Sequence, residues 1–387
     1  MRNDVSLFVL SMKRVIPLLI SAFFTLIILC VHLSKFITTM INGGSSGISN
    51  FALSETIHLH RTHPVFIRRK LTTWLIDFLA DISGFEIGIS FVLVNFSFLF
   101  LSGILVFKLS KLFSSNFSHN IFSLIGYFLC FPIFFMFFPP VYSYDEPLQF
   151  CLIFLSLIYF FKEEYWKFSF TFAIGLITRE SGIIILPALF FVFVYDWRNS
   201  LLQNFTNKKV LIKCISLALS ILLYGSYLFY FTRNNKANEA SKEYFLQRLS
   251  YIKWNFQNSE FAIESIGGFL LVFAIPLYFL FLKRNKKDII GIKERKMLKA
   301  FFITLIINTA IVYLNTKARE VRLFLIPMFF LWPVFGSLFF NEISLFLKFD
   351  KYKNVFLNLK SSLIFFLITI INLYLSFILY HPTAGLK

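Results

Sequence analysis

The stretch "IGISFVLVNFSFLFLSGILVF", residues 87–107, decides the fold class, because it is long, apolar and free of charged residues. A helix needs about 20 consecutive apolar residues to cross the hydrocarbon core of a bilayer. This run meets that length without interruption. The stretch therefore predicts a membrane-spanning helix.

The composition of the whole chain agrees with this stretch. Of 387 residues, 57% are hydrophobic and 20% aromatic, and the mean hydropathy is +0.73, whereas soluble domains contain about 45–50% apolar residues. The 56 phenylalanines lie in long apolar runs and not between basic residues, so they do not indicate a surface for stacking nucleic-acid bases. We expect membrane lipids and no nucleic acid as partners.

Similar apolar runs recur along the chain and predict an all-α, polytopic integral membrane protein with about eleven spans in one transmembrane domain, residues 1–387. The first run is too long for a signal-peptide core and is read as a retained span. The expected spans are residues 15–36, 87–107, 120–142, 147–161, 167–178, 182–196, 210–231, 264–282, 299–315, 323–347 and 361–380.

The net charge of +18 is read as a topology signal. Cytoplasmic loops of membrane proteins carry an excess of Lys and Arg. A cytoplasmic N-terminus places the basic segments 207–209, 283–296 and 348–353 on the cytoplasmic side. Because the chain is rich in Phe, Ile and Lys, as in AT-rich bacterial genomes, we expect a bacterial inner (plasma) membrane location.

Two long segments then lie on the outer side, residues 37–86 and 232–263. The first contains an amphipathic stretch, in which Leu71, Leu75, Phe78 and Leu79 share one helical face beside Trp74. Tryptophan is enriched at membrane–water interfaces. This pattern predicts a short helix that lies on the outer leaflet.

The stretch "GLITRESGIIILP", residues 175–187, places Arg179 and Glu180 side by side among apolar residues. A charge in the centre of a bilayer costs about 2.5–3.5 kcal/mol on insertion scales. The flanking runs form either one kinked helix or two short helices that meet at a turn. We expect the two charges to line a polar pocket open to the outer side; the alternative is an ion pair that only fixes the turn.

Four charged groups fall on the outer side in this topology, and three of them lie at tight turns. Arginine matches phosphate oxygens with a planar fork of donors, and a carboxylate serves as a general base or a metal ligand. Together they predict a site for a lipid-linked phosphate, with a divalent cation possible as cofactor. The groups are Glu55 to Lys70 with Arg61, Arg68 and Arg69; Asp145 and Glu146; Arg179 and Glu180; and Arg319, Glu320 and Arg322.

Within this site we expect Arg179 and Arg322 to hold the phosphate, with Arg61, Arg68, Arg69 and Arg319 as further binding residues. The catalytic carboxylate is Glu55 or Asp145, with Glu146 beside it, while Glu180 and Glu320 orient the arginines. Simpler readings remain open. Acidic residues before Pro147 are also typical of a helix N-terminus, and Arg68, Arg69 and Lys70 suit contact with lipid headgroups.

The segments "YSYDEPLQFCLIFLSLIYFF", "LITRESGIIILPALFF" and "AREVRLFLIP", after a long charged first outer loop, give a pattern that extends over most of the chain. This pattern resembles the multi-span glycosyltransferases of the GT-C superfamily. The resemblance implies a polyprenyl-phosphate sugar as donor and a catalytic Asp or Glu early in the first outer loop. The chain departs from the family there, since it has no Asp between Lys35 and Asp77, and Glu55 is the nearest carboxylate.

Three other classes stay open. A transporter or flippase of lipid-linked oligosaccharides would carry polar residues at mid-span and often internal repeats, and neither is evident in the sequence. A polymerase of such oligosaccharides would carry its charge in two large outer loops, and a membrane protein without catalysis would explain the missing first-loop Asp.

Overall fold

The computed structural model describes residues 12–30, 50–63, 66–136, 144–195, 207–234, 251–282 and 291–347. Within these ranges every regular element is a helix, so the all-α prediction is confirmed for this part of the chain. The expected span at 361–380 and the centre of the second outer segment, residues 235–250, lie outside the described residues.

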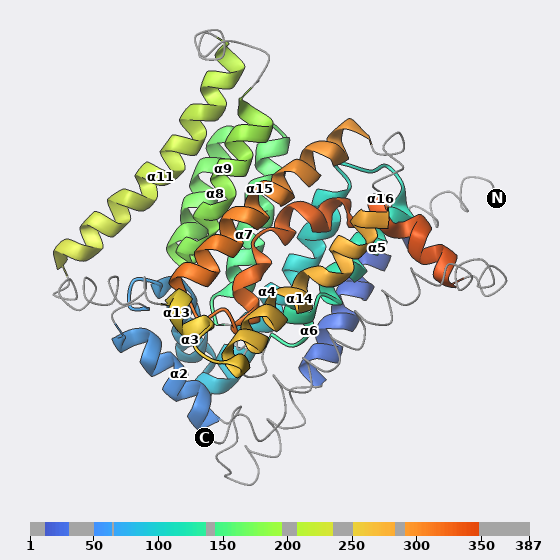
Figure 1. The fold of residues 1–387 in the computed structure, drawn as a ribbon. Coiled ribbons are helices and arrows are strands. Elements are labelled where there is room, and N and C mark those ends of the chain that lie inside the picture. Colours follow the sequence, from blue (N-terminus) through green and yellow to red (C-terminus); the bar gives the residue numbers. More distant parts are fainter. Residues whose placement is uncertain are drawn as a thin grey trace, which may run out of the picture. The chain divides into compact units, whose positions relative to one another are not determined.

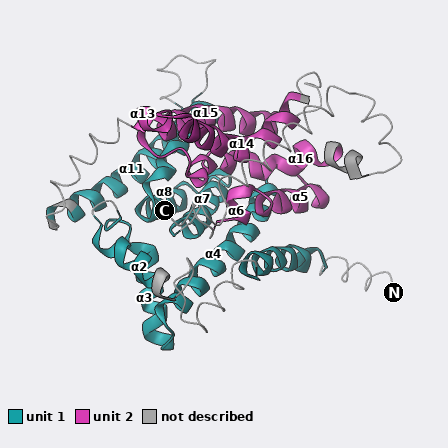
Figure 2. Cartoon of the chain, turned by 60° about the horizontal axis from the view of Figure 1, so that its bottom comes forward, with its two compact units in different colours: residues 1–112, 143–246 teal, residues 113–142, 247–387 magenta. Residues whose placement is uncertain are grey.

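The chain forms two compact units, coloured separately in Figure 2. Unit 1 consists of residues 1–112 and 143–246, and unit 2 of residues 113–142 and 247–387. Both are built from apolar helices, and the expectation of one transmembrane domain stays a prediction.

In unit 1 the helices α4, α7, α8 and α11 pack in that order, each against the next (Figure 1). The two short helices α2 and α3 pack against α4, and α3 also contacts α8. The elements are a helix at Met12–Cys30, α2 (Asn50–Thr62), α3 (Lys70–Ser83), α4 (Ile87–Ser110), α7 (Glu146–Phe161), α8 (Tyr165–Thr178), the 3₁₀-helix η1 (Glu180–Ile184), α9 (Ile185–Leu189), the π-helix η2 (Phe190–Val194) and α11 (Lys208–Asn234).

In unit 2, α16 packs against both α5 and α15. The contact with α5 is close, since Gly336 on α16 lies against the backbone of His119 and its N–H donates to Ser123 Oγ at 2.9 Å. The elements are α5 (Phe117–Phe128), α6 (Phe131–Phe134), α13 (Tyr251–Asn255), α14 (Ser259–Leu282), α15 (Ile292–Asn315), the 3₁₀-helix η4 (Val321–Leu325) and α16 (Met328–Leu347).

Five described helices are long and apolar enough to cross a membrane. Eleven spans are not confirmed, because other expected spans are short or broken helices. For example, the 16 residues of α7 extend for only about 24 Å at 1.5 Å per residue, less than the ~30 Å hydrocarbon core. The five are Met12–Cys30, Ile87–Ser110, Lys208–Phe231, Ser259–Phe281 and Ile292–Asn315.

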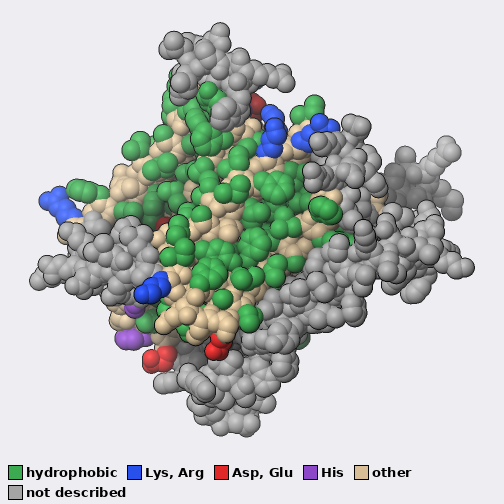
Figure 3. Space-filling model, in the orientation of Figure 1, with side chains coloured by type: hydrophobic (Ala, Val, Ile, Leu, Met, Phe, Trp, Pro, Cys, Tyr) green, Lys and Arg blue, Asp and Glu red, His purple; other side chains and the backbone are tan. Residues whose placement is uncertain are grey.

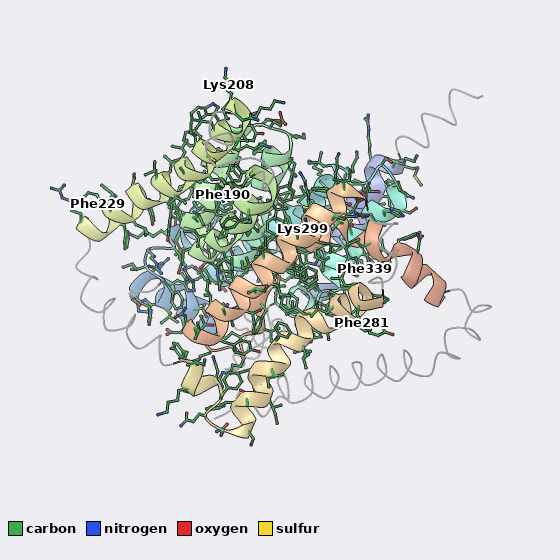
Figure 4. All side chains as sticks on the ribbon, turned by 45° about the horizontal axis from the view of Figure 1, so that its top comes forward. Phe190, Lys208, Phe229, Phe281, Lys299 and Phe339 are labelled. Atoms are coloured by element: carbon green, nitrogen blue, oxygen red, sulfur yellow. The ribbon has the colours of Figure 1, made fainter. Side chains whose placement is uncertain are left out.

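Large apolar side chains point outward from these helices. Leu19 is 62% exposed, Phe229 69% and Ile306 71%. Figure 4 labels Lys208 at the start of α11 and Phe229 near its end, and hydrophobic side chains gather over much of the described surface on the face drawn in Figure 3. Apolar surface of this extent is unfavourable in water and suits lipid. The described chain is all-helical, and its apolar helices indicate a membrane protein.

Two expected spans are interrupted. In the run 120–142, α5 ends at Phe128 and α6 begins at Phe131, with Pro132 in the first turn of α6. Proline is favoured in a first turn because it lacks the N–H that would be unpaired there. In the run 323–347, the 3₁₀-helix η4 ends at Leu325 and α16 starts at Met328, directly after Pro327.

Candidate functional site

Asp145 and Glu146 lie at the start of α7. Asp145 is the N-cap residue, and Pro147 lies in the first turn, as the helix-start interpretation expects. Glu146 Oε2 accepts a hydrogen bond from the backbone N–H of Tyr144 at 2.9 Å. Both carboxylates are buried, so they are not simply a solvated helix end.

Arg179 lies at a break between two helices, which is the second of the two alternatives left open by the sequence. α8 ends at Thr178, and Arg179 is extended, with φ −160° and ψ 121°, before η1 begins. The side chain of Gln149 bridges the break: its Nε2 donates to Arg179 O at 2.9 Å and to Ser181 Oγ at 3.1 Å. The turn is therefore stabilised from α7 and not only by its own residues.

The charges at this break pair with residues from other elements. Arg179 forms a buried ion pair with Glu146. Glu180 accepts two hydrogen bonds from Arg69, at 2.6 and 2.9 Å, and one from Arg68 at 2.7 Å. We call this group the charged cluster: Arg68, Arg69, Asp145, Glu146, Arg179 and Glu180.

The Glu180 contact is strongly charge-assisted. Burial by itself would raise the pKa of Glu180, but Arg69 and Arg68 hold it well below its usual value. Burial would likewise lower the pKa of Arg69, and the Glu180 carboxylate keeps it above its usual value. Both partners therefore stay charged, and they tie the segment before α3 to the start of η1.

Asp145 is different, because it is the cluster's least satisfied member. It is 1% exposed, and neither carboxylate oxygen makes a hydrogen bond of good geometry among the described residues, although the Thr72 side chain is near enough to lower its pKa slightly. Its nearest cationic atoms are Arg69 Nη1 and His60 Nδ1, each 3.9 Å from Oδ2. Burial raises the pKa of Asp145 to about 7, against the opposing effect of Arg69. Burial therefore favours the protonated, neutral form of Asp145.

His60, from α2, is held between two aromatic rings. Its ring is stacked on Tyr144 at a centroid distance of 3.7 Å and on Phe66 at 4.6 Å. Tyr144 is itself fixed by a 3.0 Å hydrogen bond between its hydroxyl and Thr73 Oγ1. The imidazole is 8% exposed, so its orientation is set by packing on both faces.

A pocket of about 540 Å³ lies beside His60, and we call it the α3 pocket. Its wall combines cationic groups with apolar ones. Arg61 pairs with Asp77 across the pocket wall, and the ammonium of Lys70 lies 5.2 Å from the ring centroid of Phe231. The lining residues are His60, Arg61, Ile67, Lys70, Leu71, Thr73, Trp74, Asp77, Ile177 and Tyr227.

The residues expected from sequence are distributed as follows. Arg61 lies in the pocket wall. The charged cluster brings Arg68 and Arg69 together with two other expected groups, Asp145 with Glu146 and Arg179 with Glu180. Glu55 is exposed on α2, and it belongs neither to the pocket lining nor to the ion pairs of the described residues. Three of the four expected groups thus meet within unit 1.

The fourth group lies in unit 2. Arg319 Nη1 is 3.7 Å from Glu264 Oε2, and its guanidinium lies over Trp254 at 5.2 Å. Arg322 pairs with Glu320 at 3.2 Å, and the orienting role expected for Glu320 stays a prediction. The side chain of Asn255 holds the preceding backbone, since it binds Thr316 O and Ala318 N.

Sequence reasoning missed the uncharged supports of the site. Gln149, Tyr144 and Thr73 each make a hydrogen bond that orders the cluster or the histidine. No linear signal marks Thr73 or Tyr144. Gln149 gives a weak one, because an amide three residues into an apolar helix needs a buried partner.

Among the described residues there is no group of three or more His, Cys, Asp and Glu side chains that could hold a metal ion. Comparison of the chain with protein families, with curated proteins and with solved structures finds no match. The class that the fold defines is thus a helical membrane protein with a buried charged cluster beside an amphiphilic pocket.

Proposed function

We propose that this chain is a membrane glycosyltransferase that moves a sugar from a polyprenyl-phosphate donor to an acceptor on the outer face of a bacterial inner membrane. One observation carries the proposal. The α3 pocket has cationic and apolar walls. His60 lines it, and the buried carboxyl of Asp145, whose pKa is raised by burial, lies 3.9 Å from His60 Nδ1. Such a pocket suits a ligand with an anionic head, an apolar tail and a proton to transfer.

The anionic head has two candidate partners in the pocket. Lys70 forms no ion pair with a described carboxylate, so its charge is available to a phosphate. Arg61 is held by Asp77 and can turn part of its donor fork toward the ligand. Arg179, expected from sequence to bind the phosphate, is 7% exposed and paired with Glu146, so we transfer that role to Lys70 and Arg61.

The apolar tail has apolar side chains beside this head. Ile67, Leu71 and Ile177 line the pocket, while Trp74, Phe78 and Ile82 follow one face of α3 and are 57%, 49% and 69% exposed. Gly84, with φ of +70°, ends α3, and the span α4 starts at Ile87. Tyr227 of α11, one of the helices long and apolar enough to cross a membrane, lines the pocket, and a prenyl chain would enter from lipid beside that helix.

The reaction that fits this arrangement is a substitution at the anomeric carbon. The acceptor oxygen forms a bond to that carbon, the bond from carbon to phosphate oxygen breaks, and polyprenyl phosphate leaves with the electron pair. The acceptor proton passes to a base in the wall, and Lys70 and Arg61 stabilise the charge that develops on the phosphate. The basic segment 207–209 lies at the start of α11, which carries Tyr227 of the pocket wall toward its other end, and it favours the cytoplasmic side for the start of that helix.

The test is transfer and binding in proteoliposomes with a panel of radiolabelled polyprenyl-phosphate sugars. Wild type is compared with Lys70→Ala and with the matched control Lys167→Ala, a lysine exposed on α8 and paired with Glu164. We expect Lys70→Ala to weaken donor binding by roughly 10- to 100-fold, the value of one charge-assisted contact. Lys167→Ala should leave it unchanged.

The outcomes separate the classes. Release of polyprenyl phosphate by wild type, weakened in Lys70→Ala, supports the transferase. Binding of the donor without turnover, together with its movement across the bilayer, would instead favour a transporter of lipid-linked sugars. Neither binding nor turnover with any donor would overturn the proposal.

A further inference from the structure

The charged group of unit 2 has no part in the proposed reaction, and two of its cations gather at one aromatic side chain. Trp254 of α13 stacks on Phe261 of α14, with 4.5 Å between the ring centroids. Lys317 Nζ lies 5.4 Å and the Arg319 guanidinium 5.2 Å from the ring centroid of Trp254. Because Phe261 covers one face of the indole, the other face is left for the two cations. We call Trp254, Lys317 and Arg319 the Trp254 site.

The backbone that carries both cations is fixed by buried contacts. Asn255 is 0% exposed; its side-chain amide donates to Thr316 O at 2.8 Å and its Oδ1 accepts from the N–H of Ala318 at 3.0 Å. Ala318, which lies between the two cations in the sequence, is also fully buried. Gly268 of α14 approaches the Ala318 carbonyl so closely that a Cβ atom would clash with it. The cations therefore extend from an ordered turn.

The Trp254 site has more positive charge than its neighbouring carboxylates compensate. Glu264 Oε2 lies 3.7 Å from Arg319 Nη1, and Glu320 pairs with Arg322. Lys317 forms no ion pair with a described carboxylate. Arg319 is 37% exposed, and a guanidinium has five N–H donors, more than one carboxylate contact uses. The site can therefore accept an anion without losing the contacts that it already makes.

The Trp254 site lies where two candidate spans end. α15 ends at Asn315, two residues before Lys317, and α14 begins at Ser259. Both helices are long and apolar enough to cross a membrane. The ends of such helices lie at the level of the lipid headgroups, where Trp is enriched. The anion that these cations meet at that level is a lipid phosphate.

We propose that the Trp254 site binds the headgroup of an anionic phospholipid. The phosphate oxygens accept hydrogen bonds from the ammonium of Lys317 and the guanidinium of Arg319, and such charge-assisted contacts are strong. Trp254 supplies an amphipathic surface for the glycerol part of the lipid. A zwitterionic headgroup would bring its own cation toward the two basic side chains, so the site prefers an anionic one. The inference goes beyond the proposed function and does not depend on it.

The experiment uses the full chain, labelled with ¹⁹F-tryptophan, in nanodiscs in which phosphatidylglycerol replaces phosphatidylcholine stepwise. The Trp254 resonance is assigned by its loss in Trp254→Phe. We expect this resonance to shift with the fraction of phosphatidylglycerol and to reach saturation. Trp166, which is 68% exposed on α8, is the internal reference for the general change in surface charge, and its resonance should show no saturable shift.

Three variants assign the binding to the site. Lys317→Ala should raise the phosphatidylglycerol fraction at the midpoint of the Trp254 shift about fivefold, the effect of one basic residue near an anionic lipid surface. Lys317→Arg keeps the charge and should keep the wild-type midpoint. The matched control is Lys299→Ala, which removes an exposed lysine nearer the start of α15 and should leave the Trp254 midpoint unchanged.

The contrary outcomes are distinct. A Trp254 shift that never saturates, or that has the same midpoint in Lys317→Ala, would report only the general surface potential and would overturn the proposal. A saturable shift caused by soluble glycerol phosphate in pure phosphatidylcholine nanodiscs would identify a site for a free phosphate compound, and a lipid headgroup would be the wrong occupant. Failure of sugar transfer in proteoliposomes would remove the proposed function and leave the Trp254 site unaffected.

Discussion

Replacing Asp145 by Asn tests the electrostatics of the site directly, because it keeps the shape of the side chain and removes its titration. The carboxylate has a pKa of about 7 in the folded protein and an ordinary value of 3.8. At 1.36 kcal/mol per pKa unit, this difference corresponds to ~4 kcal/mol. That is the cost to folding of ionising Asp145 in its buried position, after the attraction of Arg69 is included.

The sign follows from proton binding. The folded protein keeps the Asp145 proton to higher pH than the unfolded chain does. The contribution of this proton to the free energy of unfolding is therefore complete below about pH 3.8 and is lost as the pH rises through about 7. Asp145→Asn, which is always neutral, should match wild type in acid. At pH 8 the variant should be more stable than wild type, by up to ~4 kcal/mol.

The assay is the free energy of unfolding of the detergent-solubilised protein, measured by denaturant titration from pH 5 to pH 8. Asp81→Asn on α3 is the control. Because Asp81 is exposed, its replacement should have little effect on the free energy of unfolding throughout this pH range. An Asp145→Asn variant that is less stable than wild type at pH 8, or whose advantage is the same at pH 5 and pH 8, would refute the reasoning.

Two further predictions concern packing and pairing. Glu180→Gln leaves Arg69 buried without its carboxylate, and we expect a loss of about 3–5 kcal/mol in the free energy of unfolding at pH 7; because the pKa of Glu180 is depressed, acid should reduce the difference between wild type and variant. An unchanged midpoint of denaturation would contradict a buried pair. In unit 2, Gly336→Ala would drive a Cβ atom into the carbonyl of His119, so we expect a fall in thermal unfolding temperature of several degrees. Gly225→Ala, which meets nothing within 4 Å, should not destabilise, and equal effects of the two variants would show that the α5–α16 contact is not as close as described.

The sequence by itself determined the helices and their environment. The long apolar run 87–107 predicted the start of α4 and ended three residues before the helix does, because helix formation and burial in lipid depend on the local succession of side chains. Local chemistry also determined the start of α7, where Pro147 follows two acidic residues. Two charges in an apolar run mark the break at Arg179 in the sequence, but they do not distinguish one kinked helix from two short helices that meet at a turn.

Only the tertiary structure decided which charges meet. Arg68 and Arg69 pair with Glu180, which lies 112 and 111 residues further along the chain, and Arg179 pairs with Glu146 and not with its neighbour Glu180. In the sequence these three arginines and three carboxylates are members of larger charged groups, and nothing local selects among their possible pairings. The selection comes from the packing of α3, α7 and α8, which fixes the distances between side chains that the chain itself keeps apart. The same packing buries Asp145 behind His60, and this burial, which no local pattern encodes, gives the carboxylate its unusual pKa.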